Sequence, residues 1–163
     1  MTWEISLEGL TALTGDVPGR LAAVVVFEDR RSRSLLGGRA SRFGVLVLQE
    51  GMLTVHDDDP SASAPVAEVR ARRLRSLGFA LALRAQAGSE QHVHGYHQRR
   101  AGEEDARAQA LAQEHRALTL VPRPPDMPER QYARILANRR SQQLLWRELW
   151  LAVLARAGAQ IAP

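Results

Sequence analysis

Residues 126–158 constrain the fold of this chain more than any other segment, because they carry the signals of a long amphipathic helix. Asp126 occupies an N-cap position, and Glu129 follows three residues later at the spacing of a capping box. The proline-rich segment 122–125 prevents a helix from entering from upstream, and Gly158 supplies a left-handed C-cap. Apolar residues recur at spacings of three and four, which predicts one apolar stripe: Tyr132, Ile135, Leu136, Leu145, Trp146, Leu149, Trp150, Val153, Leu154 and Ala157.

This stripe has two interpretations. In the first, it closes a hydrophobic core, and burial of Trp146 and Trp150 stabilises the fold by a few kcal/mol each, at about 25 cal/mol per Å² of apolar area. In the second, the same rings, with Leu149 and Val153 beside them, form an interface for a protein partner, a second copy of the chain or a membrane surface. Polar residues at 139–143 interrupt the stripe, so its first half is expected to bend or to project from the core.

Length and composition predict a single domain spanning residues 1–163. The hydrophobic fraction is 45%, which is enough for a core, and there is no cysteine to form disulfides or thiolate metal sites. We find no signal peptide and no apolar run of the roughly 20 residues that a transmembrane helix needs, so a cytoplasmic protein is expected. All 22 basic residues are arginine, which indicates a GC-rich bacterial genome.

The region 21–121 is predicted to be mainly antiparallel β-structure. Its buried core is expected at residues 21–27, an apolar run rich in β-branched side chains. Alternating polarity and turn residues predict further strands at 42–48, 52–56, 66–72, 79–83, 91–96 and 117–121. A small helical insertion rich in alanine, glutamine and glutamate is expected near residues 102–115.

These elements predict an α+β fold: a β sandwich or partly open barrel of about seven antiparallel strands, capped by a long C-terminal helix. The order resembles that of bacterial pleckstrin-homology-like domains, with Trp146 and Trp150 on the capping helix as the supporting residues. The resemblance implies a non-enzymatic binding module that recognises a protein partner or an anionic, phosphate-bearing ligand. A second resemblance, to the opening of roadblock-type domains, is carried by residues 7–30.

Three histidines form the sharpest cluster of chemically active side chains. His92 and His94 lie on one face of a predicted strand, and His97 follows the turn at Gly95. Neutral imidazoles at this spacing can bind zinc, nickel or copper, which gives a metal-binding protein or a metal-dependent enzyme as an alternative function. The competing interpretation is that they are solvent-facing strand residues. The acidic run 57–59 lacks the ligand spacing of a calcium loop and is interpreted as a solvated turn.

Arginines concentrate in three places, and one of them is the preferred candidate for anion binding. The first cluster flanks a predicted hairpin loop and consists of Arg30, Arg31, Arg33, Arg39 and Arg42. The resemblance places a phosphorylated ligand at such a loop. Two further clusters lie at residues 70–75 and 99–100. Forked guanidinium groups hold phosphates of any origin, so nucleic-acid binding is the first alternative. No nucleophile or phosphate-loop motif is present, so catalysis is not expected.

Overall fold

A computed structural model describes residues 19–33, 39–56, 62–75, 77–83, 90–96 and 103–163. The strands are β1 (Arg20–Arg33), β2 (Arg39–Gln49), β3 (Met52–His56), β4 (Ala62–Pro65), β5 (Arg70–Arg73), β6 (Phe79–Ala82), β7 (Gln91–Gly95) and β8 (Gln160–Ala162). The helices are the 3-10 turn η1 (Val66–Glu68) and the α-helices α2 (Glu103–His115), α3 (Glu129–Leu136) and α4 (Arg139–Ala157).

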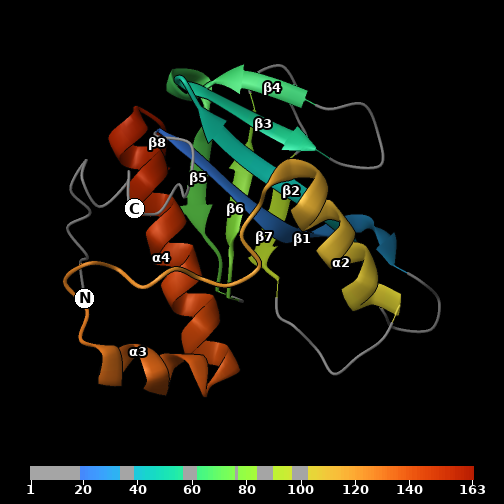
Figure 1. Cartoon of the computed structure of the whole chain (residues 1–163). Coiled ribbons are helices and arrows are strands. Elements are labelled where there is room, and N and C mark those ends of the chain that lie inside the picture. Colours follow the sequence, from blue (N-terminus) through green and yellow to red (C-terminus); the bar gives the residue numbers. More distant parts are fainter. Residues whose placement is uncertain (1–18, 34–38, 57–61, 76, 84–89, 97–102) are drawn as a thin grey trace.

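The strands form one curled sheet in the order β4-β3-β2-β1-β7-β6-β5-β8 (Figure 1). Strands that are neighbours in the sheet pair antiparallel, with one exception. Strand β8 follows the last helix and pairs parallel with β5. The two halves of the sheet join where β7 pairs with the second half of β1, at Val25 to Glu28. The fold class is therefore the predicted one, an α+β curled half-barrel with a C-terminal helix, and the described residues form eight strands rather than about seven.

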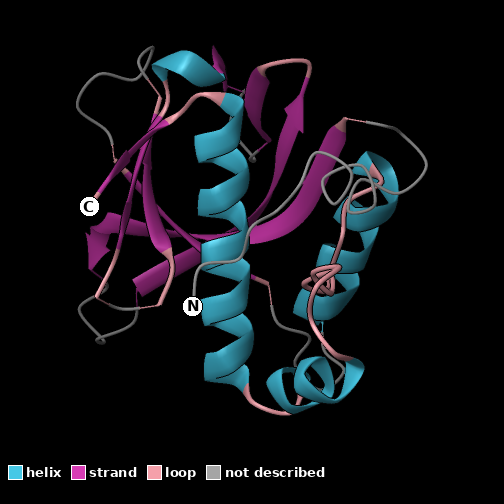
Figure 2. Ribbon diagram, turned by 90° about the vertical axis from the view of Figure 1, so that its left-hand side faces the viewer, coloured by secondary structure: helices cyan, strands magenta, loops and turns pink. Residues whose placement is uncertain are grey.

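The apolar run in β1 is buried on both faces, which explains its lack of alternation. Leu21, Val25 and Phe27 point into the main core, where each is at most 2% exposed. Ala22 and Val24 point to the opposite face, where they belong to a smaller core under α2. The two helices thus cover opposite faces of the same strands, with α4 inside the curl and α2 outside it (Figure 2).

Helix α4 fills the concave side of the sheet with aromatic side chains. Trp150 is 1% exposed and Trp146 is 6% exposed, and their ring centroids lie 6.0 Å apart. Trp146 also stacks on Phe79 of β6, with centroids 5.6 Å apart. Leu149 and Val153 are each 1% exposed in the same core. All four stripe residues that the sequence singled out are therefore covered by the chain itself, as the core-closing interpretation requires.

The expected single helix over residues 126–158 is in fact two helices, α3 and α4, which meet at a sharp bend. Asn138 has extended backbone angles, and its side chain accepts a hydrogen bond from the Ser141 amide at 3.1 Å, so it is the N-cap that starts α4. Asp126 was the wrong N-cap, because α3 begins after Pro128. The predicted C-cap is correct: Gly158 ends α4 in the left-handed region, with φ of 109°.

Two strand predictions are also corrected. Residues 117–121 form no strand; only Leu118 bridges β1, where its amide donates to the Ala22 carbonyl at 2.7 Å. It fills the space that β7 leaves beside the first half of β1. The expected strand at 66–72 is divided into η1 and β5, because Val66 starts a 3-10 turn with its buried side chain in the core. Among the described residues, no helix is long and apolar enough to cross a membrane.

The burial of Trp150 gives a first prediction. Substitution Trp150→Ala should remove about 3–5 kcal/mol from the free energy of unfolding, because it leaves a large cavity at the centre of the core. Urea denaturation followed by circular dichroism measures this loss. The control is Leu120→Ala, since Leu120 is 55% exposed and its truncation should change stability by less than about 0.5 kcal/mol. Equal stability of the two variants would contradict the role assigned to α4.

Candidate anion-binding groove

The outer face of β5 carries two arginines that strand alternation separates from the core. Arg70 and Arg72 point away from the core, whereas Ala71 between them is 3% exposed and packs within it. Across the sheet, Arg70 lies opposite Ala82 and Arg72 opposite Ala80 of β6. Small side chains therefore stand beside large cationic ones, which leaves a depression in the sheet surface.

This depression is a groove with a volume of about 490 Å³. The two alanines of β6 form its floor, and the arginines of β5 stand on one side. Strand β8 pairs with β5 on the side away from β6 and supplies the rest of the lining. The described residues that line it are Arg70, Ala71, Arg72, Ala80, Ala82, Glu90, Gln160, Ile161 and Ala162. The volume suits a small ligand such as a phosphate-bearing group.

The charges in the groove favour an anion. Arg72 forms an ion pair with Glu90, which is the one carboxylate among the described residues of the lining. Arg70 is exposed, and within the described part of the chain its side chain makes no hydrogen bond or ion pair. The groove therefore contains two guanidinium groups and one carboxylate, with one cation available to a ligand. Arginine suits this task because its planar fork matches phosphate and carboxylate oxygens.

The neighbouring Arg73 has a structural role instead. Its Nε and Nη2 atoms donate to the two oxygens of Glu148 on α4, at 2.9 and 2.7 Å. The hydrogen bonds from Arg73 and the nearby charge of Arg147 hold the pKa of the Glu148 carboxyl below its ordinary value. This pair joins β5 to α4 from the inner side of the sheet. The arginine cluster at 70–75 is thus split by alternation into a part that faces the groove and a structural part.

The histidines of β7 lie near this groove but are not solvent-facing, which corrects that interpretation. His92 is 3% exposed, and its Nε2 lies 3.8 Å from Oε1 of Glu90. His94 lies on the same outer face, with its Nε2 3.4 Å from Oε1 of Glu28 on β1. His97 lies outside the described residues. Within them, no three histidine or carboxylate side chains are close enough to hold a metal ion. Zinc binding that depends on His97 stays a prediction.

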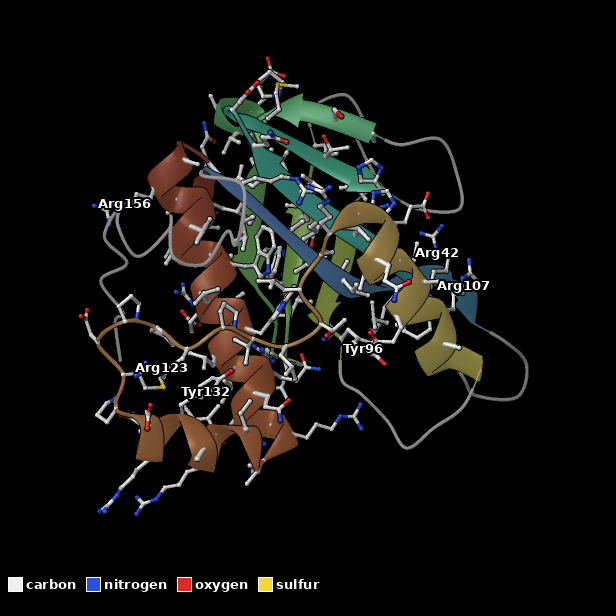
Figure 3. The ribbon with its side chains drawn as sticks, in the orientation of Figure 1. Arg42, Tyr96, Arg107, Arg123, Tyr132 and Arg156 are labelled. Atoms are coloured by element: carbon white, nitrogen blue, oxygen red, sulfur yellow. The ribbon has the colours of Figure 1, made fainter. Side chains whose placement is uncertain are left out.

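Of the five arginines in the hairpin cluster that the sequence favoured, the structure describes only the side chain of Arg42. Arg30, Arg31, Arg33 and Arg39 belong to β1 and β2, but their side chains lie outside what the structure describes. Arg42 is partly buried on β2, and Figure 3 shows it beside Arg107 of the α2 helix that covers this strand. Anion binding at the hairpin therefore stays a prediction.

A second groove, of about 400 Å³, lies on the outer face of β2 and β3 beside the end of α2. Arg20 in this groove donates to the His115 and Arg116 carbonyls at the C-terminus of α2, where a cation is favourable. The rings of His56 and His115 are in contact, with centroids 4.4 Å apart. Because Arg20 is already occupied by the helix end, this groove offers a weaker anion site than the groove at β5.

The burial of His56 and its contact with His115 make the free energy of unfolding depend on pH. Burial lowers the pKa of His56 below 6.5, and the positive charges of His115 and Arg20 lower it further, whereas Glu114 opposes them. The unfolded chain therefore binds this proton at a higher pH than the folded one. The stabilising contribution is complete above about pH 6.5 and is lost as the pH falls through the folded pKa.

We therefore expect the melting temperature to fall less between pH 7.5 and pH 5.5 in His56→Gln than in the wild type. Glutamine cannot be protonated in this range, so the difference in proton binding disappears. Differential scanning fluorimetry at the two pH values measures the change. Arg156→Ala, an exposed substitution on α4, should retain the wild-type pH dependence (Figure 3). If His56→Gln loses as much stability as the wild type between the two pH values, the assignment is refuted.

Sequence reasoning missed three parts of the β5 groove. The alternate spacing of Arg70 and Arg72 on a predicted strand was a usable signal for a shared face. Glu90 was placed in a turn, and nothing near it indicated that it would meet β5. Gln160 follows the helix end, where no strand was expected. No protein-family model matches this sequence, and no curated protein matches it significantly.

Proposed function

We propose that this protein is a non-enzymatic binding module that recognises a small phosphate-bearing anion in the groove on the outer face of β5, β6 and β8. The observation that carries the proposal is the pair of arginines at the groove, of which Arg70 makes no ion pair within the described residues. The order of the strands and the C-terminal helix support a pleckstrin-homology-like relationship, which is part of the same proposal.

In this mechanism the Glu90 carboxylate competes with the ligand for the guanidinium group of Arg72. Without ligand, Arg72 is paired with the Glu90 carboxylate at the groove wall. An arriving phosphate uses Arg70 first and then exchanges with Glu90 for the guanidinium of Arg72. Both partners of the ion pair are about two-fifths exposed, so the exchange costs little, about 0.2–1 kcal/mol for a surface pair. Phosphate then forms strong, charge-assisted hydrogen bonds to the guanidinium groups of both Arg70 and Arg72.

The test is calorimetric titration with inorganic pyrophosphate, combined with amide chemical shifts to locate the site. We expect Arg70→Ala/Arg72→Ala to weaken binding at least tenfold, because charge-assisted bonds to arginine contribute about 1.5–3 kcal/mol each. We expect Glu90→Gln to strengthen binding by about 1.4- to 5-fold, since the competing pair is worth about 0.2–1 kcal/mol.

The matched control is Arg130→Ala/Arg134→Ala, which removes the same charge from exposed positions on α3. It should bind pyrophosphate like the wild type. The competing location is the hairpin, tested by Arg30→Ala/Arg31→Ala/Arg33→Ala. Loss of binding in the hairpin variant with normal binding in the groove variant would overturn the assignment to β5. Absence of pyrophosphate binding in the wild type would overturn the proposed function itself.

A further inference from the structure

We infer that the bend between α3 and α4 is a docking surface for the phosphate backbone of a duplex nucleic acid. Four arginines lie on α3 and on the first turn of α4: Arg130, Arg134, Arg139 and Arg140. All four are exposed, and none makes a side-chain hydrogen bond or ion pair within the described residues. We name this set the elbow arginines.

The positions of the elbow arginines oppose the stability of the helices that carry them. Arg130 and Arg134 are one helical turn apart, and like charges at this spacing destabilise a helix by about 0.2–0.5 kcal/mol. Arg139 and Arg140 occupy the first turn of α4, where no acidic residue is present and the helix dipole disfavours a cation. The helix dipole favours Arg134 in the last turn of α3, but local folding gives no such reason for the other three charges, whose cost a polyanionic partner offsets.

The shape of this region fits a large partner rather than a small ligand. The apolar side of α3, with Tyr132, Ile135 and Leu136, packs on the main core. The opposite side is directed outward, and Figure 3 shows long nitrogen-tipped side chains that project from α3 away from the body of the molecule. The only acidic residues on the same stretch are Asp126 and Glu129, so the elbow retains a net positive charge. A projecting cationic surface is complementary to a row of phosphates.

The orientation of the side chains favours a duplex over the other polyanions. Tyr132 is the aromatic residue of α3, and its hydroxyl donates to the Val121 carbonyl, so its ring is not presented for base stacking. A single strand is therefore a poor fit. The apolar residues of α3 are turned inward, so they cannot anchor the helix in a lipid surface. Arginines alone contact phosphates without reading bases, so binding is expected to be independent of sequence.

This surface is separate from the proposed groove at β5. The elbow precedes α4, whereas β8, which lines part of the groove, follows it. The 19 residues of α4 separate the two ends by about 28 Å at 1.5 Å per residue. Ligands at the two places would therefore not compete directly, and each proposal can fail without the other.

The experiment is fluorescence anisotropy of the full chain with a labelled 20-base-pair duplex at 50 and 150 mM salt. If the four arginines each contact one phosphate, affinity should fall about 50-fold between the two salt concentrations, from a slope of about 0.9 per contact. Arg130→Ala/Arg134→Ala removes two contacts and should reduce this ratio to about 7-fold while weakening binding at low salt. Its melting temperature should not fall, because both side chains are exposed and their mutual repulsion is removed.

The matched control is Arg116→Ala/Arg156→Ala, which changes the net charge equally at exposed positions and should leave both the affinity and the salt dependence as in the wild type. No binding of the duplex at 50 mM salt would overturn the inference. Binding that is lost in the control variant instead of the elbow variant would also overturn it. So would stronger binding to phosphatidylserine vesicles than to the duplex, because the partner would then be a membrane surface.

Discussion

The fold depends on the packing of α4 against the concave face of the sheet. Trp146 lies so close to β7 that a Cβ atom added to Gly95 would be 2.9 Å from the indole ring. A similar contact exists between Gly44 of β2 and Phe27, where the added atom would lie 2.3 Å from the phenyl ring. Rings therefore lie directly on strand backbone at both points, and a glycine is required at each. The curl of the sheet follows from this close approach.

The strand β1 connects the two halves of this arrangement. Its first half pairs with β2 and is bridged by Leu118, and its second half pairs with both β2 and β7. Because α4 and α2 lie on opposite faces, every residue from 21 to 25 has to be apolar, and a continuous run replaces the usual alternation. The same strand therefore determines where both helices pack.

The parts of the fold that could be predicted are those set by local chemistry. The buried run in β1 and the C-cap at Gly158 depend on a few adjacent residues, and the sequence identified both. The break before α4 was missed because Asp126 and Asn138 are both good capping residues, and only tertiary packing selects between them. Strand β8 was missed because three residues carry no periodic signal, and its pairing with β5 is a long-range contact.

In the candidate site, too, long-range contacts could not be predicted from the sequence. The sequence located clusters of arginine, but it could not assign a role to each member. Pairing with Glu148 is decided by α4, which is 75 residues from Arg73 along the chain. The net charge of +4 is therefore a poor guide to ligand binding, because several arginines serve the fold.

Three further arginines show how the fold uses its cations. Arg20 donates to the last carbonyls of α2, Arg147 to the Leu74 carbonyl, and Arg123 to the Met127 carbonyl. Arg20 and Arg147 satisfy backbone acceptors where a helix or strand has ended, and Arg123 satisfies one in the turn before α3, which is a structural task that arginine performs well. Within the described residues, Arg70 at the groove and the elbow arginines make no such contact. This difference from the structural arginines is why we propose external anions as their partners.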